Sequence, residues 1–79
     1  MASWWVEYAR PAANYLEDNG SLVAKLFFAI EALAESEGLA NDATLIEPGL
    51  YRFEPENHQV VYERDERRQI VYVLIIKPK

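Results

Sequence analysis

Hydrophobic and polar positions alternate at the start of this chain. In residues 4–8, Trp4, Val6 and Tyr8 fall on one face of an extended segment, and Trp5 and Glu7 fall on the other. This period of two is typical of a half-buried β-strand. The pattern predicts a first strand over residues 4–8.

Helical spacing follows in two segments. Pro11 suits the first turn of a helix that ends at Asn19, because its missing N–H has no partner there. Ser21 is a typical N-cap for a second helix that continues to Glu37, with Gly38 just beyond its end. The two segments are predicted to form a helical hairpin. Each has an apolar face: Ala12, Tyr15 and Leu16 on the first, and Leu22, Val23, Leu26, Phe27, Ile30, Leu33 and Ala34 on the second.

After Pro48 and Gly49 the period returns to two. Residues 38–44 have no periodicity and are predicted to be a linker. Three strands then follow, separated by turns rich in Pro, Asn, Asp and charged residues: 50–54, 59–63 and 70–76. The last strand is apolar on both faces, which indicates an interior strand, whereas the charged strand 50–54 is predicted to be an edge.

These elements predict a single α+β domain over residues 1–79 with the order β-α-α-β-β-β. The helix hairpin is expected on one face of a four-stranded, mainly antiparallel sheet. Because the last strand needs a second neighbour and only strand 4–8 remains, the predicted sheet order is first, fourth, third and second strand.

One face of such a sheet is left without a helical cover. The uncovered side is expected to carry Trp5 and Val61 with one apolar set of the last strand, Val73 and Ile75. Phe28 lies on the polar side of its helix. Exposed apolar surface of this extent usually marks an interface, so these five residues are candidates for binding a partner. The alternative is that the last strand is simply buried and Phe28 packs against the first helix.

The amino-acid composition limits the kinds of catalytic, metal and cofactor site that this chain can form. The chain has no cysteine and one histidine, His58, which excludes disulfides, thiolate zinc sites, cysteine nucleophiles and multi-histidine metal centres. Glu31 and Glu35 lie one helical turn apart, but without a companion histidine they are better explained as solvated acids than as metal ligands. No nucleotide-binding glycine pattern occurs. Neither a metal nor a cofactor is expected, so a partner protein is the remaining support for so small a core.

Charge and hydropathy bear on location and partners. Thirteen acidic and eight basic residues give a net charge of −5, which disfavours non-specific binding to nucleic acids. No apolar run is long enough for a membrane helix, and the N-terminus lacks the features of a secretory signal. The sequence therefore predicts a cytoplasmic protein without a membrane association.

The order of elements resembles the RelE/ParE superfamily of bacterial toxins over nearly the whole chain. The similar pieces are residues 12–16, the strand Leu50-Tyr51-Arg52-Phe53, the segment His58-Gln59-Val60-Val61-Tyr62, and the last strand through Lys79. The resemblance implies a toxin of a type II toxin–antitoxin system, neutralised by an extended antitoxin segment. RelE-like members cleave messenger RNA in the ribosome, and ParE-like members inhibit DNA gyrase.

The resemblance also indicates where a ribonuclease site would lie. Arg52, His58, Tyr62 and Lys79 are the candidate catalytic residues of a reduced RelE-like site. Gln59 occupies the position where RelE-like enzymes have an arginine, and a neutral amide cannot replace a guanidinium on phosphate. Glu54 stands where a second cation is expected. Most of the nuclease constellation is therefore missing.

Two further features have alternative interpretations. His58 could be a general base, but its place after Pro55 also fits a role in the turn. The basic residues Arg64, Arg67 and Arg68 could meet phosphates or an acidic partner, although the acids between them favour charges paired within a solvated hairpin.

Three functional hypotheses follow. The first is a toxin-fold protein that binds an antitoxin and a macromolecular target, such as the ribosome with its mRNA or DNA gyrase, without clear nuclease activity. The second is a ribosome-dependent RNA endonuclease. The third is a non-toxic interaction module of the same fold. A homodimer is also compatible with the uncovered sheet face.

Overall fold

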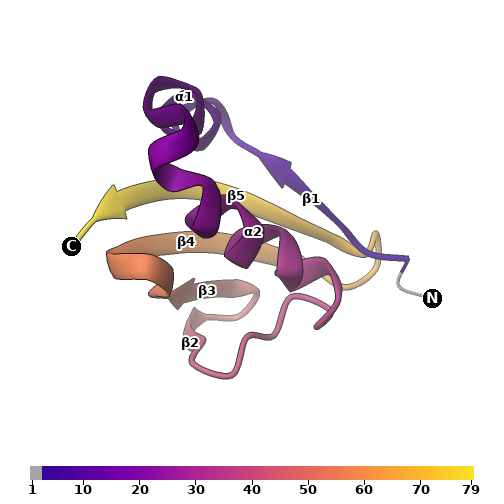
Figure 1. Ribbon diagram of the computed structural model, residues 1–79. Coiled ribbons are helices and arrows are strands. Elements are labelled where there is room, and N and C mark those ends of the chain that lie inside the picture. The colour runs from indigo at the N-terminus through magenta and orange to yellow at the C-terminus, as the bar shows by residue number, and fades with distance from the viewer. Residues whose placement is uncertain (1–2) are drawn as a thin grey trace.

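A five-stranded mixed sheet carries the helical segments on one face (Figure 1). The computed structural model describes residues 3–79. Three short 3-10 turns occupy Gly20–Val23, Ala32–Ala34 and Pro55–Asn57. The main elements are β1 (Trp5–Tyr8), α1 (Arg10–Asn19), α2 (Ala24–Glu31), β2 (Thr44–Glu47), β3 (Leu50–Phe53), β4 (His58–Asp65) and β5 (Ile70–Pro78).

The strand order is β1-β5-β4-β3-β2. Strand β1 pairs in parallel with β5, with Val6 opposite Val71 and Tyr8 opposite Val73, and the other pairs are antiparallel. The predicted neighbours of the last strand are thus confirmed, because β5 lies between β1 and β4. Its apolar side chains on both faces fit this interior position.

The prediction of four strands was wrong, because β2 adds a fifth. Thr44, predicted to end a linker, begins this strand, and β3 is therefore an interior strand and not the edge. All four side chains of β2 are exposed. Because neither face of β2 is buried, nothing imposes an alternation of apolar and polar residues, and the sequence pattern does not reveal the strand. Backbone hydrogen bonding to β3 across the turn at Pro48 and Gly49 holds β2 in place, and this pairing depends little on side chains.

The second helix is also shorter than predicted. Its α-helical part is Ala24–Glu31, preceded and followed by 3-10 turns, so the helical run is kinked instead of forming two regular helices of a hairpin. Ser21, predicted to be the N-cap of this helix, lies inside the 3-10 turn Gly20–Val23, and the N-cap of α2 is Val23. The N–H of Gly38 does donate to the carbonyl of Leu33 at 2.7 Å, which closes the helical run as expected of a glycine at this place.

The core lies between the helical run and one face of the sheet. The alternation predicted in β1 is confirmed: Trp4 is buried and Val6 and Tyr8 pack against the core, whereas Trp5 and Glu7 are exposed. Leu22, predicted on the apolar stripe of the second helix, is instead exposed. The buried residues that form the core cluster are Trp4, Ala12, Val23, Leu26, Ile30, Leu33, Phe53, Val60, Tyr62, Val71, Val73 and Ile76.

Candidate functional site

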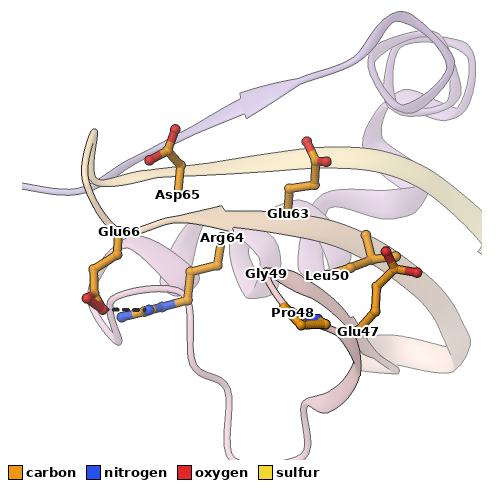
Figure 2. Close-up of a pocket in the computed structure, with 8 residues that line it drawn as sticks. All are labelled: Glu47, Pro48, Gly49, Leu50, Glu63, Arg64, Asp65 and Glu66. Carbon is orange, nitrogen blue, oxygen red and sulfur yellow. Dashed lines mark hydrogen bonds and ion pairs between the residues drawn. The ribbon is translucent and has the colours of Figure 1, made fainter.

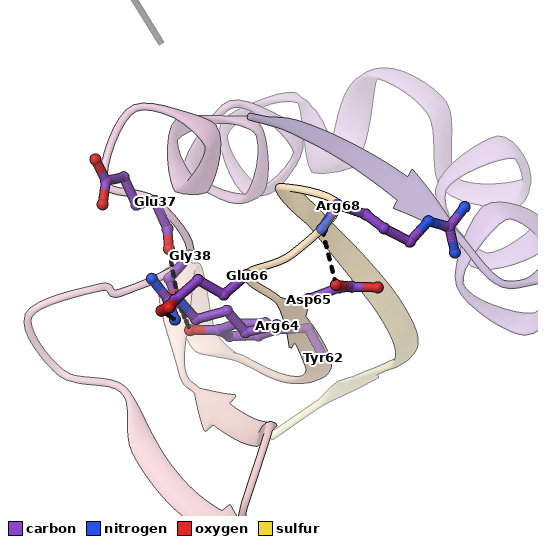
Figure 3. A network of polar contacts seen from close by, with 7 residues as sticks. All are labelled: Glu37, Gly38, Tyr62, Arg64, Asp65, Glu66 and Arg68. Carbon is purple, nitrogen blue, oxygen red and sulfur yellow. Dashed lines mark hydrogen bonds and ion pairs between the residues drawn. The ribbon is translucent and has the colours of Figure 1, made fainter. Parts of the chain in front are cut away.

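Tyr62 is a structural residue of the core. Its side chain is completely buried, stacked on Tyr51 and met edge-on by Phe53. Its hydroxyl donates a 2.6 Å hydrogen bond to the carbonyl of Gly38 (Figure 3). Burial disfavours the phenolate and raises the pKa of Tyr62 to about 12. The hydroxyl of Tyr62 is therefore inaccessible to an RNA substrate in this structure.

His58 is held by hydrogen bonds on both ring nitrogens. Nδ1 lies 2.7 Å from the carbonyl oxygen of Glu56, and Nε2 lies 2.8 Å from the hydroxyl of Tyr15. A carbonyl only accepts, so Nδ1 carries the proton and Nε2 accepts from Tyr15. The lone pair that a general base would use is already engaged. His58 thus fixes the turn before β4 and ties it to α1, which agrees with the structural alternative raised by the sequence.

The other two candidate catalytic residues are Lys79, whose backbone N–H donates to the carbonyl of Asn57 beside His58, and Arg52 on β3. The ammonium of Lys79 forms an ion pair with the carboxylate of Glu54 at 3.1 Å. The ammonium is therefore already engaged by an acid of the same chain. Arg52 pairs with Val61 across β3 and β4, whereas its neighbour Tyr51 pairs with Tyr62. Because successive side chains of a strand point to opposite faces, Arg52 and Tyr62 face opposite sides of the sheet.

The arrangement therefore does not bring Arg52, His58, Tyr62 and Lys79 together as a site. Tyr62 is buried in the core, and His58 is bound within a turn. Lys79 is paired with an acid, and Arg52 lies on the face without helices. An RNA cleavage reaction needs a proton acceptor and cations around the same phosphate. The described residues provide no such grouping of these four side chains.

Arg64 is likewise committed to internal contacts. Its Nε donates to the carbonyl of Glu37 at 2.6 Å, and its Nη1 pairs with Glu66 at 3.2 Å. Its guanidinium also lies over the ring of Trp4, 4.8 Å from the centroid. In the same hairpin Asp65 accepts a 3.0 Å hydrogen bond from the backbone N–H of Arg68 (Figure 3). For Arg64 the prediction of charges paired within the hairpin is confirmed.

The residues predicted to bind a partner divide into three groups. Trp5, Val61 and Ile75 lie on the face of the sheet that no helix covers, which we call the open face. Trp5 and Ile75 are 53% and 40% exposed. Phe28 is 69% exposed but lies on α2, on the opposite side of the sheet. Val73 is completely buried beneath the helices, so it is not available to a partner in this structure.

The open face also carries acids that sequence reasoning missed. Glu7 of β1 lies beside Tyr72, and Tyr72 lies beside Glu63 of β4. Glu63 in turn lies beside Leu50, and Leu50 beside Glu47 of β2. These five residues form a row across all five strands, which we call the acidic row. Only the strand register aligns them, so no local sequence pattern could have revealed the row.

Two shallow hollows lie along the acidic row. One, of about 260 Å³, is lined by Glu7, Glu63, Asp65, Arg68, Ile70 and Tyr72. The other, of about 370 Å³, extends toward the turn of Pro48 and Gly49 (Figure 2). In Figure 2 Glu63 and Asp65 project from one side of β4 and Arg64 from the other, and Glu66 follows in the turn.

Neither a metal cluster nor a membrane span is found in residues 3–79. No three His, Asp or Glu side chains in this part of the chain are placed to hold a metal ion. None of its helices is both long enough and apolar enough to cross a membrane.

Comparison with solved structures identifies the fold. A free RelE toxin double mutant from E. coli superimposes with a TM-score of 0.77 at 18% identity, covering 99% of this chain and 84% of that one. An archaeal RelE–RelB complex from Pyrococcus horikoshii gives 0.75 at 16% identity, covering 99% and 96%. The RelBE2 toxin–antitoxin complex from Mycobacterium tuberculosis gives 0.73 at 16% identity, covering 96% and 98%.

No protein-family model and no curated protein matches the sequence. At identities below a fifth, the likeness to the solved structures rests on shape and topology, not on shared site residues. It extends over nearly the whole chain. The chain therefore has the fold of the RelE toxins of type II toxin–antitoxin systems.

Proposed function

We propose that this chain is the toxin-like component of a type II toxin–antitoxin system, and that it acts by binding an antitoxin and a macromolecular target in the cytoplasm. The observation that carries the proposal is the near full-length match to RelE toxins, two of which were solved with RelB antitoxins. The exposed apolar side chains of Trp5, Phe28 and Ile75 supply surface for such a partner.

We further propose that the chain lacks RelE-type ribonuclease activity. By resemblance to RelE-like enzymes Gln59 stands in place of an arginine, and in this chain Tyr62 is buried and Lys79 is ion-paired with Glu54. A guanidinium supplies two donors to a phosphate and an amide does not, so the charge that develops during cleavage would be poorly stabilised. Binding to a target such as the ribosome or DNA gyrase then remains as the toxic action.

Growth measurements test the toxin role. Expression of the chain alone in bacteria is expected to arrest growth, and co-expression of the protein encoded by the adjacent reading frame is expected to restore it. Normal growth at a verified level of folded protein would contradict the toxin role and favour a non-toxic interaction module of the same fold. A chain with the substitution Ile30→Asp, which puts a carboxylate at a fully buried position and is expected to unfold the protein, serves as the control for expression burden.

RNA cleavage is tested separately with purified chain and ribosomes that carry a defined mRNA. An active RelE toxin is the positive control. We expect no cleavage above background, and no change on substitution of Arg52 by alanine. Cleavage that disappears in Arg52→Ala, while the variant remains folded, would instead establish the endonuclease alternative.

A further inference from the structure

The acidic row places three carboxylates along one line on the open face of the sheet. Along the row, carboxylates on β1, β4 and β2 alternate with Tyr72 and Leu50 on β5 and β3. The side chains of Glu7, Glu47 and Glu63 are exposed. The row itself contains no cation, so phosphate backbones are repelled from it.

The carboxylates of the acidic row form no ion pair with the described residues. Within residues 3–79 the ion pairs are those of Arg64 with Glu66 and of Lys79 with Glu54, and neither involves the row. Glu7 accepts a 2.9 Å hydrogen bond from the indole N–H of Trp5, which orients its carboxylate on the open face. Arg68 lines the adjoining hollow at the turn between β4 and β5 and forms none of these ion pairs.

Apolar and aromatic surface adjoins the carboxylates. Trp5 lies beside Ile70 in the neighbouring row, and Tyr72 lies between Glu7 and Glu63. A cation held by a carboxylate next to an aromatic face gains attraction from both, and the stem of a lysine or arginine covers apolar surface. The chemistry of the open face thus complements a partner that presents basic and apolar side chains together.

The spacing of the row favours a helical partner. Neighbouring strands lie about 4.8 Å apart, so carboxylates two strands apart are separated by roughly 9.6 Å. Residues seven apart on one face of an α-helix are separated by about 10.5 Å, with those three and four apart between them. An extended segment fits less well, because its same-face residues fall at about 6.6 and 13 Å.

We propose that the acidic row binds an amphipathic helix of a partner protein, with basic residues seven positions apart over the glutamates and apolar residues between them over Tyr72 and Leu50. A second copy of this chain does not supply such a helix. The cations of α1 and α2 are Arg10 and Lys25, one on each helix. This inference concerns the surface alone and does not depend on a toxic activity.

Designed peptides test the spacing directly. The probe is an alanine- and glutamine-rich helix with three lysines seven residues apart and leucines three and four residues after each of the first two. The control peptide has the same composition with the lysines moved to the opposite face. We expect the probe to bind the purified chain at least about fivefold more tightly than the control, measured by the anisotropy of a fluorescent label.

Substitutions then locate the contact. Glu63→Gln is expected to weaken binding of the probe about threefold, and the triple change Glu7→Gln, Glu47→Gln and Glu63→Gln at least about tenfold. The matched control is Glu17→Gln, an exposed acid of α1 on the other side of the sheet, which should leave affinity unchanged. In a spectrum of backbone amides, the probe should shift signals of Tyr72, Glu63 and Leu50.

Several results would overturn the proposal. Equal affinity for both peptides would mean that net charge alone drives binding, and shifts confined to α1 and α2 would place the peptide on the helices. Preferential binding of an RNA oligonucleotide at this face, or a dimer in sedimentation that the triple change abolishes, would assign the face to another occupant. Failure of the probe to bind at all would also contradict it, whatever the outcome of the growth measurements.

Discussion

The hydroxyl of Tyr62 donates a hydrogen bond to the carbonyl of Gly38, and both residues are buried. This contact ties the middle of β4 to the segment that follows the helical run (Figure 3). It also explains why a tyrosine occupies a fully buried position. The polar end of the ring satisfies a carbonyl that would otherwise be unpaired in the core.

Removal of this hydroxyl should destabilise the fold. Tyr62→Phe leaves the Gly38 carbonyl without its partner, and we expect the free energy of unfolding to fall by about 1–3 kcal/mol in urea titrations. Tyr72→Phe, which removes the hydroxyl of an exposed tyrosine, is the matched control and should change it by less than about 0.5 kcal/mol. Equal effects of the two substitutions would contradict a stabilising role for the bond.

The free energy of unfolding should decrease at alkaline pH. The pKa of Tyr62 is about 12 in the folded state against 10.0 for a free tyrosine, so the unfolded chain loses this proton first as the pH rises. The contribution is fully present below pH 10 and is lost as the pH rises toward 12. Burial and the hydrogen bond to Glu31 also raise the pKa of Tyr8, and this acts in the same direction.

Urea titrations at a series of alkaline pH values measure this decline, and tyrosinate absorbance follows the ionisation of the folded protein. In Tyr62→Phe the decline should be smaller, because one of the two shifted groups is absent. A free energy of unfolding that stays constant above pH 10 would show that the buried tyrosines ionise as freely as in the unfolded chain.

Gly38 should tolerate a methyl group less well than Gly49. Both have a left-handed backbone, with φ of +77° and +82°, so alanine adds similar backbone strain at each. A Cβ on Gly38 would lie 3.1 Å from Cγ of Arg64 and 3.2 Å from Cγ2 of Val71, whereas on Gly49 the nearest atom is at 3.9 Å. Gly38→Ala should cost about 1–3 kcal/mol more than Gly49→Ala in thermal or urea unfolding. An equal loss of stability at both sites would indicate that backbone strain alone, and not the close contacts at Gly38, determines the cost.

The edge strand and the core should respond differently to loss of a leucine. Leu45 of β2 is 57% exposed, and Leu26 of α2 is 1% exposed. We expect Leu26→Ala to lower the free energy of unfolding by about 2–5 kcal/mol and Leu45→Ala by less than about 0.5 kcal/mol. A large effect of Leu45→Ala would mean that β2 is held by side-chain packing and not by its backbone hydrogen bonds.

The sequence by itself determined the elements with a repeating apolar pattern. Alternation in β1 identified Trp4 as an inward residue and Trp5 as an outward one, and the doubly apolar β5 indicated its place between two strands. These features are local, because burial of one face imposes a period of two on a strand and about 3.6 on a helix.

The fifth strand, the role of Tyr62 and the acidic row were decided only by the tertiary structure. Strand β2 carries no burial pattern, since its pairing uses backbone groups that every residue has. The role of Tyr62 depended on which face of β4 the helices cover, and the acidic row depended on the register of five strands. Register and facing are set by contacts between residues far apart in the chain, so no short stretch of sequence encodes them.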